Sequence, residues 1–233
     1  MPRQIPVGDA PLSSLPGPKQ ALWDLPTRLF HWLLVALVAF SWWSAKNDEI
    51  GLHIGSGITI LGLLIFRVLW GFFGSSTARF SGFVRGPKTV LAYLKDRGSW
   101  RSAGHTPLGA LSIVTLLGLL VLQVSLGLFN ADEDGFYEGP LAHFASPAAA
   151  DVVHELHELN FDILLAFIAL HVGSILFYRL VEGKKLTKAM ITGRGALPTG
   201  AEPMRSGRWW TALLCLAIAI GVASWIYAGA PPL

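Results

Sequence analysis

Charged residues are scarce in this chain: they make up 14% of its 233 residues, whereas a soluble domain usually carries about 25%. Hydrophobic residues make up 52%, and the mean hydropathy is +0.51. This composition disfavours a water-soluble domain and excludes intrinsic disorder. The nine tryptophans fit a bilayer, because Trp collects at the two membrane interfaces. The sequence therefore predicts an integral membrane protein.

Cysteine is almost absent. Cys215 is the only one, and it stands inside an apolar run. A single cysteine cannot form an intrachain disulfide, and the Cys-x-x-Cys-His motif of covalent c-type haem attachment is excluded. The first 28 residues contain several prolines and no long apolar core, so they do not resemble a secretory signal peptide. The first hydrophobic run is therefore expected to remain as a membrane anchor.

Five hydrophobic runs approach the roughly 20 residues with which a helix spans a bilayer. They are residues 29–45, 50–73, 107–129, 151–180 and 209–228. In lipid every backbone amide must be satisfied internally, so these runs are helices. The predicted fold class is an all-α integral membrane protein: a four-helix transmembrane bundle with an additional C-terminal transmembrane helix. The expected divisions are 1–28 as a cytoplasmic N-terminal segment, 29–185 as the bundle, 186–208 as a cytoplasmic linker, and 209–233 as the fifth helix with a periplasmic end.

Lysine and arginine fall almost entirely before the first run, between the second and third, and between the fourth and fifth. The opposite loops carry only Lys46 as a base. The positive-inside rule then places the N-terminus in the cytoplasm and the C-terminus in the periplasm. Membrane orientation explains these bases better than nucleic-acid binding, which is not expected. Within an inner loop, residues 86–97 are predicted either as a short helix on the membrane surface or as an ordered loop.

Four histidines occupy matched depths in the predicted helices: His53 and His157 near the outer edge, and His31 and His171 near the inner edge. His157 and His171 lie 14 residues apart, so they project within ~40° of each other and stand ~21 Å apart along the helix axis. Two flat macrocycles stacked across a bundle, each held by two imidazoles, require such an arrangement. A single histidine at a helix end is more often an interfacial side chain. The set of four therefore carries the argument, and four histidines spread over ~21 Å cannot surround one metal ion.

Other residues are weighed against these four. His154 lies about 100° around the helix from His171, so His157 is the better ligand. His105 and His143 are expected to be solvated loop side chains. Arg67 follows His53 by 14 residues on the same face and suits the propionates of an inner haem, with a snorkelling interfacial arginine as the alternative. Gly55 and Gly57 are candidate porphyrin neighbours, although ordinary helix packing also explains glycines in membrane spans.

Several segments resemble the prokaryotic cytochrome b561 family, above all its branch that includes the cytochrome b subunits of nickel-iron hydrogenases. They are W-D-L-P-T-R-L-F-H-W-L-L (23–34), L-H-I-G-S-G-I-T-I with R-V-L-W-G (52–71), G-H-T-P-L-G-A-L (104–111) and H-E-L-N-F-D-I-L-L-A-F-I-A-L-H (157–171). The resemblance covers roughly residues 20–185. It implies two non-covalent b haems, with His53 and His157 as axial ligands of the outer iron and His31 and His171 as those of the inner iron. The fifth helix departs from the four-helix pattern of the simplest members.

The resemblance also implies a function: electron transfer across a bacterial inner membrane between a periplasmic redox partner and the quinone pool. A quinone site is expected near Arg67, Trp70 and His105. The acidic residues of the outer loops favour a positively charged partner, such as a c-type cytochrome, that docks over residues 132–138. The resemblance to the branch with hydrogenase cytochrome b subunits suggests a hydrogenase-like enzyme as partner instead. The alternatives are a superoxide:quinone oxidoreductase of the same fold, which the acidic outer face disfavours, and a haem-free metal-binding or transport protein. The acids of the outer loops are Asp48, Glu49, Asp132, Glu133, Asp134, Glu138, Asp151, Glu155 and Glu158.

Overall fold

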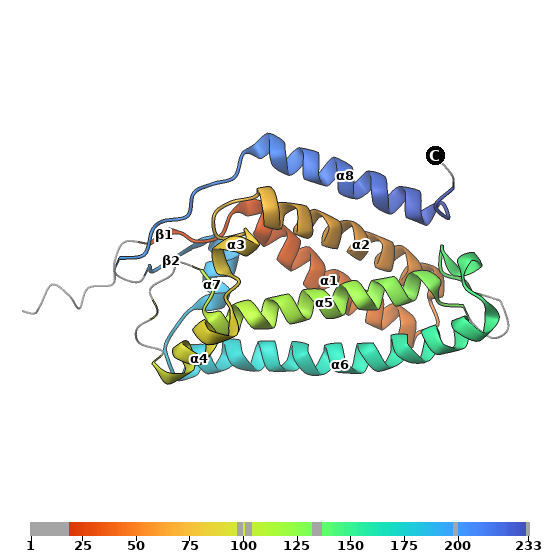
Figure 1. The fold of residues 1–233 in the computed structure, drawn as a ribbon, viewed down its shortest axis with the longest axis horizontal. Helices are drawn as coiled ribbons and strands as arrows, with labels where there is room; N and C mark the ends of the chain where they lie inside the picture. The colour runs from red at the N-terminus through yellow and green to blue at the C-terminus, as the bar shows by residue number, and fades with distance from the viewer. Residues whose placement is uncertain (1–18, 97–99, 101–103, 132–136, 198–199, 232–233) are drawn as a thin grey trace, which may run out of the picture.

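The computed structural model describes residues 19–96, 100, 104–131, 137–197 and 200–231, and these form a bundle of long helices (Figure 1). Within the described residues, five helices are long and apolar enough to cross a membrane. The predicted all-α fold with five spans is thereby confirmed. The five helices are α1 (Leu25–Lys46), α2 (Ile50–Phe73), α5 (Pro107–Phe129), α6 (Pro147–Leu180) and α8 (Trp209–Tyr227).

Shorter elements gather mainly at the end of the bundle where the described chain begins (Figure 1). The surface helix considered for residues 86–97 is present as α4, whereas the expected linker 186–208 contains a helix, α7, and a strand, β2. The strand β2 pairs antiparallel with β1, and Gln20 lies opposite Gly195. This pairing joins the segment before the first span, α1, to the segment after the fourth span, α6. The short elements are β1 (Gln20–Ala21), α3 (Phe80–Phe83), α4 (Pro87–Lys95), η3 (Ala142–Phe144), α7 (Leu186–Thr192) and β2 (Arg194–Gly195).

Two spans begin earlier than their apolar runs. The helix α1 begins at Leu25 rather than at residue 29, because the Asp24 carboxylate accepts a hydrogen bond from the Thr27 backbone N–H at 2.8 Å. The helix α6 begins at Pro147 rather than at residue 151, directly after Ser146. Proline suits a first helical turn, where its missing N–H has no partner to lose. The mixed first turns of α6 are therefore helical.

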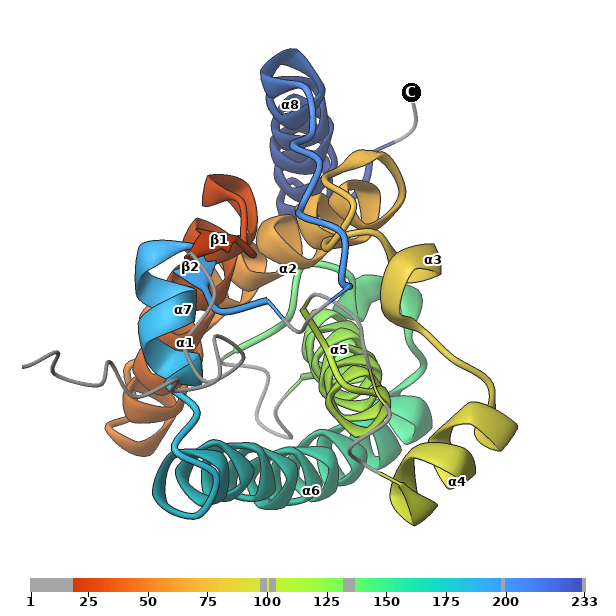
Figure 2. The ribbon, with the colours of Figure 1, turned by 90° about the vertical axis from the view of Figure 1, so that its left-hand side faces the viewer.

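The helices α1, α2, α5 and α6 surround a common centre when viewed along the bundle, and α8 lies outside them beside α2 (Figure 2). The helix α2 packs closely against α1, α5 and α8, and α5 packs closely against α6. Among the described residues, α1 and α6 make no comparably close backbone approach, although Trp42 and Phe161 place their rings 6.2 Å apart. The sides of α1 and α6 that face each other are thus separated by side chains rather than by interlocked backbones.

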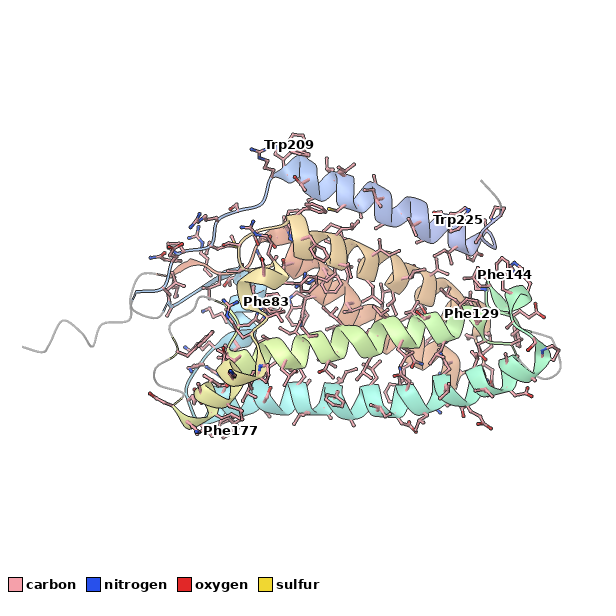
Figure 3. All side chains as sticks on the ribbon, viewed as in Figure 1. Phe83, Phe129, Phe144, Phe177, Trp209 and Trp225 are labelled. Carbon is pink, nitrogen blue, oxygen red and sulfur yellow. The ribbon has the colours of Figure 1, made fainter. Side chains whose placement is uncertain are left out.

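The exterior of the bundle is apolar. Leu170 is 67% exposed and Leu180 77% exposed, as expected for side chains that face lipid rather than water. Trp209 and Trp225 mark opposite ends of α8 (Figure 3), and tryptophan prefers these interfacial levels of a bilayer. The protein is accordingly a multi-pass membrane protein with five candidate spans.

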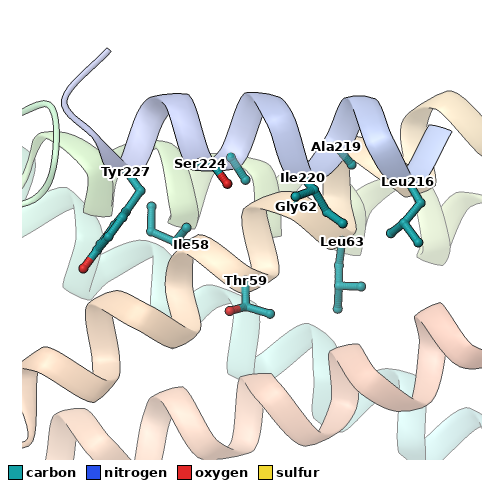
Figure 4. A pocket seen from close by; sticks show the side chains of 10 residues that line it. Ile58, Thr59, Gly62, Leu63, Leu216, Ala219, Ile220, Ser224 and Tyr227 are labelled. Carbon is teal, nitrogen blue, oxygen red and sulfur yellow. The ribbon is translucent and has the colours of Figure 1, made fainter. Parts of the chain in front are cut away.

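Small residues hold α8 against α2. The buried residues of α8 are Cys215, Ala219 and Ala223, which recur every fourth position and form one stripe. A Cβ built on Gly62 of α2 would lie 3.6 Å from the Ala223 Cβ, so the two helices meet closely there. Beside this contact a groove of about 310 Å³ opens between the helices, lined mostly by apolar side chains such as Leu63 and Leu216 (Figure 4).

Candidate functional site

His53 and His157 face each other near one end of the bundle. Their ring centroids lie 6.1 Å apart and the rings are nearly perpendicular, at 87°. His53 Nδ1 lies 2.9 Å from the Ser41 carbonyl oxygen and 3.1 Å from the Ser41 hydroxyl. An Nδ1–H that donates to a backbone carbonyl fixes the tautomer in which Nε2 carries the free lone pair. Ser41 therefore orients His53 as a ligand through Nε2.

A polar network on α5 and α6 surrounds His157. The Gln123 amide donates to His157 Nε2 at 3.1 Å and to the His157 carbonyl at 3.0 Å, while Asn160 donates to the Gln123 carbonyl oxygen at 2.6 Å. His157 Nδ1 is buried and has no hydrogen-bond partner among the described residues. A Cβ built on Gly127 would lie 3.1 Å from His157 Cε1, so glycine there makes room for the imidazole. These neighbours were not predicted from the sequence, although a glutamine inside so apolar a span is a usable signal of a polar site.

His154 is placed differently from His157, although it lies only one turn away on α6. His154 is exposed, and its Nδ1 lies 3.3 Å from the Asn130 amide oxygen. Only His157 of the two forms a ring contact with His53. This is the difference in azimuth that the helical spacing predicted.

His31 on α1 and His171 on α6 form the second pair, at the opposite depth. They lie close enough to interact electrostatically. His31 Nδ1 is buried and has no hydrogen-bond partner among the described residues. These two imidazoles come from α1 and α6, whose backbones make no comparably close approach among the described residues.

Arg67 is buried at this second level, with 3% of its surface exposed. Its guanidinium lies 4.9 Å from the centre of the Phe80 ring, and Nη1 has no partner among the described residues. The nearby Asp24 carboxylate is engaged elsewhere, because it accepts from the Thr27 N–H at 2.8 Å and from the Trp70 indole N–H at 3.0 Å. Trp70 is 1% exposed, and its indole N–H is used by the hydrogen bond to Asp24.

The expectation that His105 is a solvated loop side chain is wrong. Its ring lies between Trp23, at a centroid distance of 4.5 Å, and Phe83, at 4.7 Å. Burial, together with smaller contributions from the charges of Arg67 and His171, lowers the pKa of His105 to about 3. The side chain is therefore neutral at physiological pH. The sequence placed His105 between spans but did not reveal that two distant aromatic residues cover it.

The remaining sequence candidates separate clearly. His143 is exposed, as expected. Gly57 lies ~40° from His53 around α2, and a Cβ built there would meet nothing within 4 Å. Gly55 lies ~160° from His53 and is exposed, so the structure does not bring it to the His53 face. Only Gly57 remains a suitable neighbour for a flat ring beside His53.

Acidic side chains line the end of the bundle near His53 and His157. Asp132, Glu133 and Asp134 lie outside the described residues. Within the described part of the chain, both ion pairs, Lys184–Glu182 and Arg205–Glu202, involve residues of the other end. The acids near His53 and His157 therefore form no ion pair with a described residue. The described acids of this end are all exposed: Asp48, Glu49, Glu138, Asp151, Glu155 and Glu158.

These residues fit two haems. Imidazole nitrogens are common axial ligands of haem iron, and helix bundles hold such cofactors in their cores. Buried nitrogens without protein partners occur on His31 and His157, and His53 is held with Nε2 free. The unpartnered Arg67 Nη1 matches the carboxylate of a haem propionate.

The fold and these side chains define a multi-pass membrane protein with half-buried histidines near both ends of its bundle. The sequence profile described as prokaryotic cytochrome b561 matches residues 22–193. The chain belongs to the prokaryotic cytochrome b561 family, whose four-helix bundle typically binds two b-type haems and acts in electron transfer. Comparisons with curated proteins and with solved structures give no match. The helix α8 lies beyond the matched residues.

Proposed function

We propose that this chain transfers electrons across a bacterial inner membrane, between a periplasmic redox partner and the quinone pool. The observation that carries the proposal is the placement of two histidine pairs at opposite depths of one helix bundle. His53 and His157 stand at one depth with ring centroids 6.1 Å apart, while His31 and His171 interact electrostatically across the bundle at the other depth. A low-dielectric bundle with a redox centre at each level connects the two faces of the membrane.

In this proposal His53 and His157 hold the outer haem, and His31 and His171 hold the inner haem. Each haem, when bound, supplies a reversible one-electron centre. The protein orients the ligands. The Ser41 carbonyl fixes the His53 tautomer, while Gln123 of α5 donates to the His157 carbonyl and Gly127 leaves room for the imidazole. Arg67 binds a propionate of the inner haem, which offsets the cost of burying its charge.

The proposed topology places the end with α3, α4 and α7 in the cytoplasm and the acidic end in the periplasm. The support is the asymmetry of lysine and arginine between the two sets of loops. The helix α4 adds to it, because Lys88 and Lys95 lie on a short helix whose Leu91 and Leu94 are exposed. Such a helix suits a surface rich in anionic lipid headgroups.

A positively charged periplasmic protein, such as a c-type cytochrome, is the proposed partner. Six exposed carboxylates at the described outer end form no ion pair with a described residue, and Lys46 is the base beside them. Opposite charges steer encounters and raise association rates without a large apolar interface. The family is also associated with hydrogenase partners, so a hydrogenase-like enzyme is the second candidate for the partner of this chain.

The test uses proteoliposomes that contain the haem-loaded protein and a reduced quinone, with soluble cytochrome c outside as an acceptor that cannot cross the bilayer. We expect quinol to reduce the cytochrome, with a rate that falls steeply as salt is added. His171→Ala should abolish the reaction, whereas His154→Ala should leave it intact. Rapid superoxide consumption coupled to quinone reduction, with no exchange with cytochrome c, would instead identify a superoxide:quinone oxidoreductase.

A further inference from the structure

The segment Gly104–His105–Thr106–Pro107 contains three residues with evident local roles. Gly104 has a φ of +88°, a left-handed conformation that favours glycine. The Thr106 hydroxyl caps α5 by accepting from the Gly109 N–H at 3.1 Å, and Pro107 occupies the first turn. None of these roles involves the imidazole of His105.

The packing of His105 needs an aromatic ring but not a nitrogen. Trp23 and Phe83 enclose the ring at centroid distances of 4.5 and 4.7 Å, and a phenylalanine would fill the same space. Yet His105 Nδ1 is buried without a hydrogen-bond partner among the described residues. Buried polar atoms in native proteins are almost always satisfied. Nothing among the described residues satisfies this nitrogen, so it is free to hydrogen-bond a bound group.

Arg67 carries a second such nitrogen in the same region. Its Nη1 is buried without a described partner, and its charge acts on His105. A line of aromatic contacts joins the two residues: Arg67 lies over Phe80, Phe80 contacts Phe83 at 5.8 Å, and Phe83 contacts His105. The two unpartnered nitrogens therefore lie in the same region of the bundle, where Arg67 and His171 both act electrostatically on His105.

The chemistry of the two donors selects an anion. A neutral carbonyl would accept hydrogen bonds but would leave the buried guanidinium charge uncompensated. Asp24 lies close enough for its charge to act on Arg67, but the hydrogen bonds that its two oxygens accept come from the Thr27 and Trp70 N–H groups. No hydrogen bond among the described residues joins Asp24 to Arg67, so the Arg67 Nη1 donor still lacks an acceptor. A carboxylate satisfies both donors at once.

We propose that His105 is a positioning residue of the inner haem, and that its Nδ1–H donates to the same propionate that Arg67 binds. The proposal rests on the proposed function, because it requires an inner haem held by His31 and His171. It adds to the axial ligands a neutral donor from the entrance of α5. The hydrogen bond from His105 partly offsets the negative charge of the propionate near the iron. It therefore raises the midpoint potential of the inner haem and leaves that of the outer haem unchanged.

The test is a potentiometric titration of the haem-loaded protein, at a pH where the propionates are ionised, on variants that separate the ring from its nitrogen. His105→Phe and His105→Met both fill the space between Trp23 and Phe83 without an N–H, and methionine sulfur packs well on aromatic rings. His105→Asn lacks the ring but places an amide N–H near the position of Nδ1. His143→Phe, at an exposed histidine of the opposite end, is the matched control.

We expect the inner midpoint potential to fall in His105→Phe and His105→Met and to remain near the wild-type value in His105→Asn and His143→Phe. Thermal stability should show the opposite order, with His105→Asn the least stable because it loses the aromatic contacts. An inner potential that is unchanged in both apolar variants, or lowered equally in His105→Asn, overturns the proposal. Absence of two resolvable b haems in the wild-type protein would contradict the proposed function itself, and the two failures are thereby distinguished.

Discussion

Gly127 offers a sharp test of the outer site, because it controls a single contact. A Cβ built on Gly127 would lie 3.1 Å from His157 Cε1 and 3.6 Å from His157 Nδ1. Favourable carbon–carbon contacts lie at about 3.5–4.0 Å. Gly127→Ala should therefore displace the imidazole by roughly 0.5 Å, which is about the tolerance of a preorganised site.

The magnitude follows from two opposing effects. Overpacking a tight contact costs about 1–3 kcal/mol, while alanine stabilises a helix interior over glycine by roughly 0.5–1 kcal/mol. The net effect is a loss of about 1 kcal/mol in the binding free energy of the outer haem, which corresponds to roughly fivefold weaker binding. The inner haem should be unaffected, because Gly127 contacts only the His157 level.

Gly118→Ala is the matched control on the same helix. A Cβ built on Gly118 meets nothing within 4 Å, so this variant gains the helix propensity without the clash. Haem content per chain after dilution in detergent, resolved into outer and inner haem by redox titration, measures both variants. Equal loss of haem from the two variants, or full retention of the outer haem in Gly127→Ala, would refute the reasoning.

Three further predictions concern the ligands, the acidic surface and the response to pH. His157→Ala should lose only the outer haem, His171→Ala only the inner haem, and His154→Ala neither; haem content and visible spectra decide, and loss of haem in His154→Ala alone would reverse the assignment on α6. Neutralising Asp151, Glu155 and Glu158 together should slow electron exchange with a basic cytochrome at low salt and flatten its salt dependence; stopped-flow rates that are unchanged at every ionic strength would exclude this surface. Burial lowers the folded-state pKa of His105 from 6.5 to about 3, so between these pH values the unfolded chain binds a proton that the folded chain does not, and stability should fall as the pH drops. Melting temperatures should fall less steeply with decreasing pH in His105→Phe than in the wild-type protein. An identical pH dependence of the two proteins would show that His105 does not contribute.

Hydrophobic length predicted the spans well, because lipid imposes a strict requirement on backbone hydrogen bonds. The helices α2 and α5 have the bounds of the runs 50–73 and 107–129. The apolar run 29–45 is short for a span and leaves room for an extension towards Trp23; the structure fixes the start at Leu25, directly after the polar cap Asp24. The helix α7 was missed because it is only seven residues long and lies in a basic segment that reads as a linker.

Helical periodicity also predicted which histidines approach each other. The spacing on α6 selected His157 over His154, and the structure places His157 against His53. Periodicity along one helix cannot identify a neighbour on another, which is why Gln123 and Gly127 of α5 emerged only from the packed bundle. The burial of His105 depends on Trp23 and Phe83, two residues distant in sequence, and no local pattern encodes that meeting.

The central claim is that four histidines hold two b haems at two depths, and the stoichiometry and spin state of the bound haem test it most directly. The purified protein should contain two haems per chain, all extractable by acidified acetone because none is covalently attached. Both should be low-spin in electron paramagnetic resonance, because each iron has two imidazole ligands. One haem per chain, a high-spin majority, or no b-type absorption would contradict the account.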